Sequence, residues 1–259
     1  MLPVLFSETI IETPTYFLLY LSAFFFGILL LSRLARSKSL SPVLAIDLGI
    51  LLFISGFLGA RLFHIFFEAF DYYLENPLAV LYFWQGGFVL YGGVLASVPV
   101  AIFVLKRRGQ DLWTWADLLV TSFFLGLGIG RLGCLSAGCC YGSVTDWWWG
   151  IIFRKPEAAA PSHLVLHPTQ ILESLFAFGL CLTLIIWGRR TNLKPGFLAL
   201  VGGGSYAVFR FFLEFLRGDK DRGLYLQDSI STSQIISILA LATIVYLFWA
   251  RLYKRGGWR

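Results

Sequence analysis

Long hydrophobic stretches follow one another along most of the chain, separated by short polar segments. Seven of them come close to the roughly 20 residues that an α-helix needs to cross a bilayer. The alternating ten-residue patterns that a membrane barrel requires are absent. The pattern therefore predicts membrane-spanning helices at residues 15–33, 46–67, 88–106, 114–132, 170–188, 196–215 and 232–250.

The composition agrees with a membrane protein. Hydrophobic residues make up 58% of the 259 positions and charged residues only 14%, whereas a soluble domain is nearer half hydrophobic and a quarter charged. In lipid, backbone polar groups must be satisfied within helices or a closed barrel. No polar linker, low-complexity segment or internal repeat divides the sequence. We therefore expect an all-α polytopic membrane protein that forms a single domain over residues 1–259.

The net charge of +6 is unevenly distributed, and its distribution predicts how the chain is oriented. More than half of the 21 Lys and Arg residues fall in four segments, 33–38, 106–108, 189–194 and 251–259, which alternate with acidic or mixed loops. Cytoplasmic loops of membrane proteins carry an excess of Lys and Arg. The N-terminus is therefore expected outside and the C-terminus inside. The excess of Lys and Arg over Asp and Glu therefore reflects the orientation of the chain in the membrane. The sequence contains no nucleic-acid-binding motif.

Several polar residues fall within or beside the predicted spans, and this topology gives each of them a depth. Asp117, at the inner end of the fourth span, is the main exception to a concentration in the outer half. An arginine at the centre of a spanning helix costs about 2.5–3.5 kcal/mol, so such residues usually face a cavity or a partner. The outer set comprises Tyr16, Arg61, Tyr91, Arg131, Glu173, Arg210 and Glu214, with His167-Pro168-Thr169-Gln170 just before the fifth span.

The arginines of this outer set suggest an anionic ligand. Arg61 taken alone is equally well explained by a side chain that extends to the interface, and Arg210 lies four residues from Glu214, where the two can pair. One carboxylate, however, cannot neutralise three arginines. The fork geometry of guanidinium groups matches the oxygens of a phosphate. We therefore expect a lipid headgroup, or its phosphate, as the ligand.

The stretch GIGRLGCLSAGCCYG, residues 128–142, surrounds one of these arginines with small residues and three of the 4 cysteines. Cys134, Cys139 and Cys140 are expected on the outer side, where a disulfide involving Cys134 is one alternative. A metal site is not expected, because the spacing C-x4-C-C is not a standard zinc pattern and few histidines accompany it. The cysteines are interpreted as structural or spectator residues.

These motifs, in this order and at these depths, carry a family resemblance. The chain resembles the phosphatidylglycerol–prolipoprotein diacylglyceryl transferase family of bacterial inner membranes over nearly its whole length. The matching residues are Gly130-Arg131-Leu132-Gly133 with Gly142, Arg210 to Glu214, His167 to Gln170 with Glu173, Gly59-Ala60-Arg61, Trp84-Gln85-Gly86-Gly87, Tyr16 and Asp117.

The resemblance implies an enzyme that moves the diacylglyceryl group of phosphatidylglycerol to the lipobox cysteine thiol of prolipoproteins, without metal or cofactor. The implied partners are phosphatidylglycerol, prolipoprotein signal peptides and membrane lipid. The implied location is the bacterial inner membrane, with the active site toward the outer leaflet. The implied catalytic residues are Arg131, Arg210, Tyr91 and Glu214, and the implied substrate-binding residues are Tyr16, Arg61, Gly92, Gly93, Gly142, His167 and Gln170.

Three positions depart from the family pattern. Tyr91 stands where the family usually has histidine, Cys134 where it has asparagine, and Cys139 where it has glutamate. A tyrosine, with a pKa near 10, can hydrogen-bond a substrate but is a poor base at neutral pH. Two alternatives therefore stay open: a paralogous lipid transferase with another acceptor, and a non-catalytic binder or transporter of anionic lipid. One-sided polar residues and the lack of inverted repeats speak against a transporter.

Overall fold

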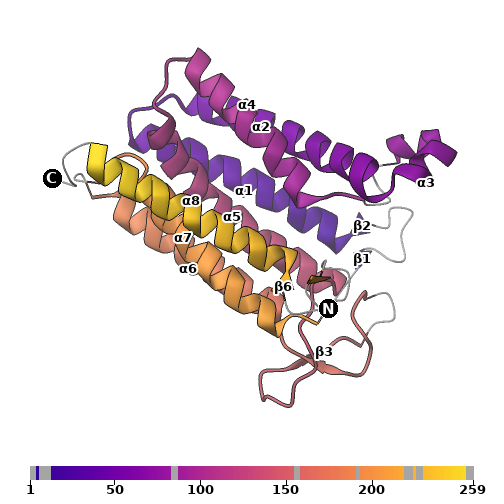
Figure 1. Cartoon of the computed structure of the whole chain (residues 1–259). Helices are drawn as coiled ribbons and strands as arrows, with labels where there is room; N and C mark the ends of the chain where they lie inside the picture. Colours follow the sequence, from indigo (N-terminus) through magenta and orange to yellow (C-terminus); the bar gives the residue numbers. More distant parts are fainter. Residues whose placement is uncertain are drawn as a thin grey trace. The chain divides into compact units, whose positions relative to one another are not determined.

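The computed structural model describes residues 4–5, 13–82, 87–154, 158–190, 193–218, 224–225 and 230–254, and helices dominate this part of the chain (Figure 1). The helices are α1 (Thr15–Ser37), α2 (Pro42–Phe63) continued by a π-helical turn (His64–Glu68), α3 (Phe70–Glu75), a 3-10 turn (Pro77–Leu81), α4 (Leu90–Arg107), α5 (Leu112–Ala137), α6 (Thr169–Gly188), α7 (Phe197–Leu213) continued by a 3-10 turn (Glu214–Leu216), and α8 (Thr232–Lys254). Three short antiparallel pairs join β1 (Val4–Leu5) to β2 (Thr13–Pro14), β3 (Ile151–Ile152) to β4 (Val165–Leu166), and β5 (Leu224–Tyr225) to β6 (Ile230–Ser231).

Within the described residues, six helical segments are long and apolar enough to cross a membrane. They are Thr15–Ser37, Pro42–Phe67, Leu112–Ala137, Thr169–Gly188, Phe197–Leu216 and Thr232–Ala250. Each overlaps a predicted span, which confirms an all-α polytopic membrane protein. The remaining predicted span coincides with α4, which has 18 residues, so the total of seven spans stays a prediction.

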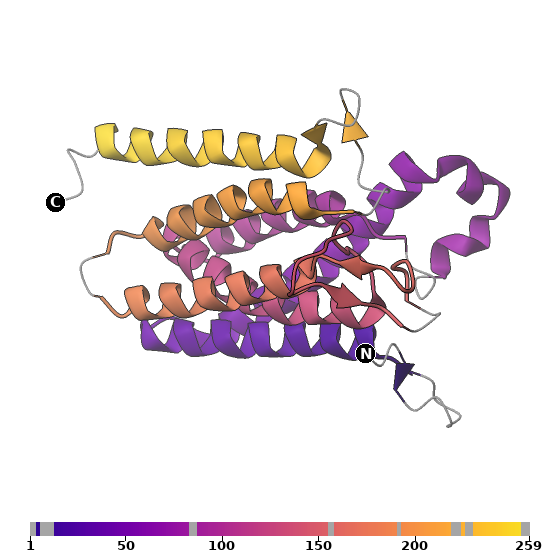
Figure 2. The same cartoon turned by 90° about the horizontal axis from the view of Figure 1, so that it is seen from below.

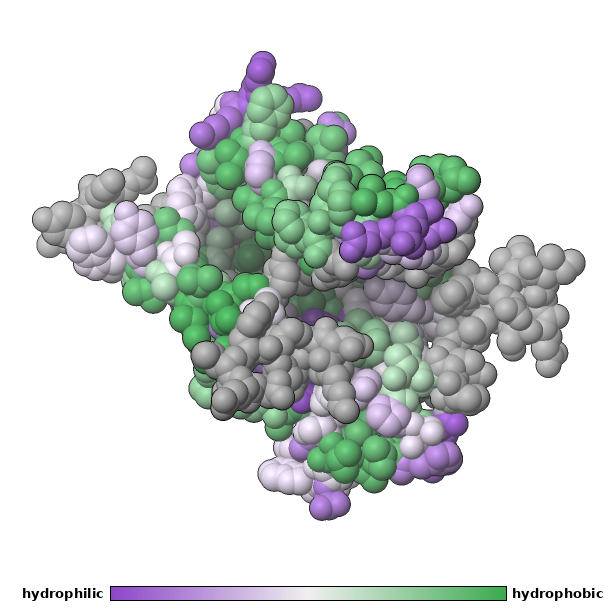
Figure 3. Space-filling view, turned by 45° about the vertical axis from the view of Figure 1, so that its right-hand side comes forward, coloured by the Kyte–Doolittle hydropathy of each residue, from purple (hydrophilic) through white to green (hydrophobic). Residues whose placement is uncertain are grey.

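The surface of these helices is hydrophobic, as lipid contact requires. Phe25, Leu239 and Val245 are each more than 60% exposed. In the space-filling view, hydrophobic residues form broad areas and hydrophilic residues gather in a few patches (Figure 3). In water, such exposed apolar area would mark an interaction surface; here hydrocarbon tails are the expected partner.

The chain forms two compact units. The smaller unit comprises residues 28–115, and the larger comprises residues 1–27 and 116–259. The helices α1 and α5 each contribute residues to both. A single domain over the whole chain stays a prediction.

In the smaller unit, α2 and α4 lie side by side (Figure 1) because small residues let their backbones approach. A Cβ atom added to Gly59 would lie 2.5 Å from the backbone oxygen of Gly92, and one added to Gly92 would lie 2.5 Å from the oxygen of Gly59. Gly93 faces Gly56 in the same way, at 3.0 Å. Close backbone approach through glycine is a usual way for membrane helices to pack.

In the larger unit, α7 lies between α6 and α8 (Figure 2). Its first turn is capped by a side chain from α5: the Asp117 carboxylate accepts hydrogen bonds from the backbone N–H groups of Gly196, at 2.8 Å, and Ala199, at 2.7 Å. The first N–H groups of a helix have no partner within the helix, and a negative charge there is favourable. Asp117, the exception at the inner end of the predicted fourth span, therefore has a structural role.

Candidate active site

Glycine ends α5 and turns the chain back toward its last helical turn. Gly138 has a left-handed φ of 73°. Its N–H donates to the oxygen of Leu135 at 3.3 Å, and the N–H of Cys139 donates to the oxygen of Cys134 at 3.1 Å. These are the two hydrogen bonds of a Schellman motif, which brings the residue after the glycine against the residue three positions before the helix end. Cys134 and Cys139 are therefore adjacent.

Arg131, three residues before Cys134, pairs with a carboxylate on α6. Its Nε lies 3.0 Å from Oε2 of Glu173, and the two side chains are only 15% and 4% exposed. The hydroxyl of Tyr206 on α7 donates to the other oxygen of Glu173 at 2.6 Å. Glu173 thus links α5, α6 and α7 through one buried carboxylate and holds the guanidinium group in place.

Arg210, near the end of α7, has its own carboxylate partner. Its Nη2 lies 2.8 Å from Oε2 of Glu214, and the same nitrogen donates to the hydroxyl of Ser233 on α8 at 3.1 Å. The pairing four residues apart matches the spacing predicted from the sequence. The other terminal nitrogen, Nη1, is buried and has no hydrogen-bond partner among the described residues.

The two arginines share an electrostatic neighbour. Tyr206 interacts with the charges of both Arg131 and Arg210, so the two side chains belong to one region of the larger unit. The structure corrects one step of the sequence reasoning, because each of these arginines has a separate carboxylate, Glu173 or Glu214. A guanidinium group has five N–H donors, however, and these contacts use only some of them.

The segment before α6 fixes the loop that follows α5. Thr169 donates through its hydroxyl to the oxygen of Cys140, and Gln170 donates through its amide to the oxygen of Cys139, both at 2.8 Å. Both side chains are at most 2% exposed. Gln170, predicted to bind substrate, is therefore seen holding the backbone of the cysteine loop.

Gly142 and His167 lie against each other just after the cysteine loop and just before α6. The Gly142 N–H donates to the His167 oxygen at 3.1 Å, and a Cβ atom at Gly142 would lie 2.4 Å from that oxygen. Gly142 also forms an antiparallel bridge with Arg217. Nδ1 of His167 is buried without a hydrogen-bond partner among the described residues, and its role in substrate binding stays a prediction.

Tyr16, at the start of α1, borders the cysteine loop. Its ring is stacked on that of Tyr20, with centroids 5.9 Å apart. A Cβ atom at Gly133 would lie 3.3 Å from the Tyr16 ring. The absence of a side chain at Gly133 therefore lets the ring pack against α5. The half-buried Tyr16 lies near enough to interact electrostatically with the three thiols.

The thiols of the loop are strongly coupled. Hydrogen bonds from the thiols of Cys134 and Cys139 lower the pKa of Cys140, and the charges of Arg131 and Arg217 add to the shift. The reciprocal contacts with Cys134 and Cys140 raise the pKa of Cys139. The contacts among the three thiols therefore favour deprotonation of Cys140 over that of Cys139.

In the smaller unit, Arg61 is buried among backbone oxygens. It is 7% exposed and donates to the oxygens of Ala79 at 2.8 Å and Gly87 at 3.2 Å. Its guanidinium carbon also lies 5.4 Å from the centre of the Tyr73 ring. The protein's own backbone oxygens therefore provide partners for Arg61, so extension to the membrane interface is not needed to explain it. A structural role is observed, and substrate binding stays a prediction.

The other predicted residues of the smaller unit divide into two groups. Gly92 and Gly93 are buried in the contact between α2 and α4, where glycine is needed for packing. The side chain of Tyr91 lies outside the described part of the chain, as do residues 84–86 of the Trp84-Gln85-Gly86-Gly87 match. Their predicted roles stay predictions.

Comparison with known proteins identifies the family of the chain. The family model of the prolipoprotein diacylglyceryl transferases matches residues 3–250. The chain belongs to the prolipoprotein diacylglyceryl transferase family. This confirms the resemblance inferred from the sequence motifs.

Individual relatives match over most of the chain. A phosphatidylglycerol–prolipoprotein diacylglyceryl transferase of Synechococcus elongatus is 34% identical, over 93% of this chain and 84% of its own length. A second, from Aeromonas salmonicida, is 33% identical over 98% of this chain and 90% of its own. A protein of Clostridium perfringens named phosphatidylglycerol–prolipoprotein diacylglyceryl transferase 2 is 38% identical over 77% of this chain and 75% of its own.

Sequence reasoning missed several residues of the site. The sequence gives no sign of Tyr206 or Ser233. Tyr206 contacts Glu173, the partner of Arg131, and Ser233 contacts Arg210 directly. The sequence places Glu173 in the outer polar set and in a family match but does not indicate its role. Spacing within one helix reveals the pair Arg210–Glu214, whereas the pair Arg131–Glu173 joins different helices and needs the packing of the bundle.

Proposed function

We propose that this chain is an integral membrane enzyme that transfers the diacylglyceryl group of phosphatidylglycerol to the cysteine thiol of prolipoproteins, the first step of lipoprotein maturation. The match to the transferase family over residues 3–250 carries this conclusion. The buried arginines of the larger unit, each oriented by a carboxylate, fit the charge that the reaction develops.

The reaction exchanges a carbon–oxygen bond for a carbon–sulfur bond. The acceptor thiol loses its proton, and its sulfur attacks the glyceryl carbon that bears the phosphate. The bond from that carbon to the phosphate oxygen breaks, and glycerol-1-phosphate leaves. The phosphodiester carries one negative charge, and the phosphate monoester that leaves carries more. Negative charge therefore grows on the leaving group during the reaction.

In this proposal, Arg131 and Arg210 bind the phosphate and stabilise the charge that grows on it. Donors that are held in place before the reaction act strongly in a site from which water is excluded. Glu173 and Glu214 are positioning residues for the two guanidinium groups. The buried Nη1 of Arg210, without a partner among the described residues, supports this assignment.

The remaining site residues have roles around the headgroup and the acceptor. His167 and Gly142 border the phosphate region, and Tyr16 covers it beside α5. Arginine charge near the acceptor would lower the pKa of its thiol from about 8.5 and favour the thiolate. Tyr91 is proposed to hydrogen-bond the substrate, because a phenol is a poor base at neutral pH.

The proposed orientation has the N-terminus outside, the C-terminus inside and the active site toward the outer leaflet of the bacterial inner membrane. The support is the distribution of Lys and Arg in alternate loops. Labelling of single engineered cysteines tests it. Reaction of a cysteine at residue 109, in the loop after α4, with an impermeant reagent from the periplasmic side would overturn this orientation.

Complementation tests the function in cells. Bacteria depleted of their own transferase should mature their lipoproteins when they express this chain. The Arg131→Ala variant should fail, while Arg154→Ala, which alters an exposed arginine in the loop after β3, should succeed. Failure of the wild-type chain at normal expression in the membrane would contradict the proposal.

A further inference from the structure

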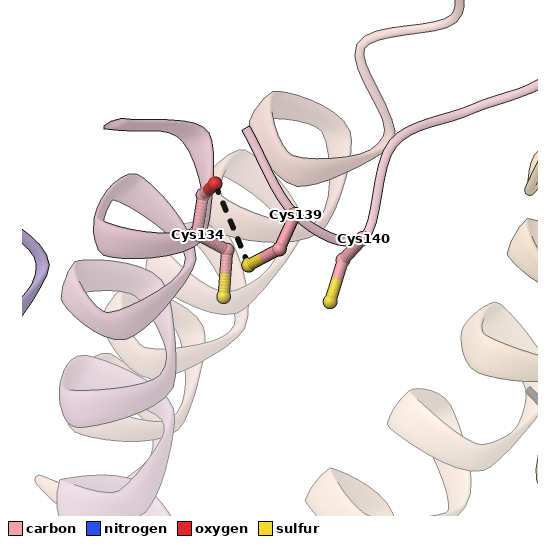
Figure 4. A group of neighbouring side chains, drawn as sticks. All are labelled: Cys134, Cys139 and Cys140. Carbon is pink, nitrogen blue, oxygen red and sulfur yellow. Dashed lines mark hydrogen bonds between the residues drawn. The ribbon is translucent and has the colours of Figure 1, made fainter. Parts of the chain in front are cut away.

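The three cysteines around the end of α5 bring their sulfur atoms together. Sγ atoms of Cys134, Cys139 and Cys140 all lie within 4.8 Å of one another. The close view shows the three side chains turned to one side of the loop, Cys134 from the helix and the other two from the turn that follows (Figure 4). All three are free thiols and only partly buried, so the cluster is accessible to a small ion.

Local structure explains why the sulfurs converge. The Schellman motif at Gly138 brings Cys139 against Cys134, and the Cys139 thiol lies 3.7 Å from the Cys134 oxygen. Cys140 has a left-handed φ of 58°. Residues other than glycine rarely adopt this conformation, and those that do are often found at functional sites.

The backbone of the cluster is fixed from α6. The oxygens of Cys139 and Cys140 accept hydrogen bonds from the buried side chains of Gln170 and Thr169. These contacts use backbone oxygens and leave the thiols available. When the ligands of a site are already held close together, less conformational entropy is lost as an ion binds.

We propose that Cys134, Cys139 and Cys140 form a three-sulfur binding site for a soft monovalent metal ion, copper(I). Thiolates are the ligands that select soft ions. Three sulfurs around one ion in a plane, with bonds of about 2.3 Å as in zinc thiolates, lie roughly 4 Å apart. Because the three sulfurs already lie within 4.8 Å of one another, shifts of about an ångström or less between sulfurs complete the site.

The donor set distinguishes copper(I) from zinc. Structural zinc sites almost always have four protein ligands in a tetrahedron. The cluster found among the described residues contains three cysteines and no histidine or carboxylate, which suits an ion that accepts three sulfurs. The nearby guanidinium of Arg131, with Nη1 4.0 Å from Sγ of Cys134, favours the deprotonated thiols that metal binding requires.

Copper(I) titration of the purified full-length protein in detergent tests the site without reference to transferase activity. The titration is carried out without oxygen, with ascorbate and a chromophoric copper(I) chelator as competitor. We expect one ion bound per chain, with three sulfur neighbours by X-ray absorption. Loss of a residue that only hydrogen-bonds a metal ligand costs about 10–100-fold in metal affinity. Cys140→Ser removes a ligand itself and should therefore lower copper(I) affinity by at least tenfold.

Matched variants make the result decisive. Cys181→Ser removes the buried cysteine in α6 and should leave the copper(I) affinity unchanged. Cys134→Ser and Cys139→Ser should each weaken binding as Cys140→Ser does, and the melting temperature of each variant shows whether it is folded. The site is refuted if wild-type protein does not compete with the chelator, or if Cys181→Ser weakens binding equally. A thiol titration that finds two fewer free thiols in the isolated protein would indicate a disulfide instead.

Discussion

Glu173 provides a prediction whose size follows from the structure. The Arg131–Glu173 pair is largely buried, and Tyr206 donates to the same carboxylate. Removal of one partner from a buried ion pair destabilises a protein by about 3–5 kcal/mol, because the other charge is left uncompensated. We expect a loss of stability in this range for Glu173→Ala.

Glu173→Gln is a milder change, because the amide oxygen still accepts hydrogen bonds. A hydrogen bond to a charged group contributes about 1.5–3 kcal/mol, against about 0.5–1.5 kcal/mol for a neutral one. With two contacts each weakened by about 1–1.5 kcal/mol, we expect a loss of about 2–3 kcal/mol. If all of this loss reaches the transition state, kcat/KM falls by roughly thirtyfold to 150-fold.

Equilibrium unfolding in mixed micelles and transfer kinetics measure these effects on the same samples. The expected order of stability is wild type, then Glu173→Gln, then Glu173→Ala. Glu75→Gln, at an exposed position in α3, is the matched control and should resemble the wild type. The reasoning is refuted if Glu173→Ala unfolds with the wild-type free energy, or if glutamine is the more damaging replacement.

Three further changes test other contacts. Gly142→Ala would put a Cβ atom 2.4 Å from a backbone oxygen and should abolish transfer and lower the melting temperature, whereas Gly130→Ala meets open space and should do neither. Asp117→Ala should cost about 0.5–2 kcal/mol in unfolding free energy, as loss of a helix cap does, and an unchanged value would contradict the capping role. Ser233→Ala removes a neutral partner of Arg210 and should raise KM for phosphatidylglycerol several-fold with little loss of stability. Ser233→Thr keeps the hydroxyl and should have the KM of the wild type.

The helices could be predicted from the sequence, although their ends could not. Hydrophobic length placed a span at 114–132, while α5 extends over Leu112–Ala137. The residues that follow the predicted span include Gly133 and Ser136, which add little to the hydropathy of the segment. The helix ends where Gly138 adopts a left-handed conformation, because that backbone geometry stops the hydrogen-bond pattern of the helix.

The candidate site could be predicted in part. Charged residues within apolar stretches are rare enough to identify Arg131 and Arg210 from the sequence alone. Their partners differ in how visible they are, since Glu214 is one turn away, whereas Glu173 and Tyr206 come from other helices. The buried position of Arg61 was equally hidden, because the oxygens that surround it belong to a turn between helices.

Transfer of labelled diacylglyceryl from phosphatidylglycerol to a lipobox peptide by the purified protein tests the central claim most directly. The account predicts thioether formation by the wild-type chain and by Arg154→Ala. It predicts losses of about a hundredfold to a thousandfold for Arg131→Ala and for Arg210→Ala, as when a charge-stabilising donor is removed. No thioether from folded wild-type protein, under conditions in which another family member is active, would contradict the account, as would full activity in either alanine variant.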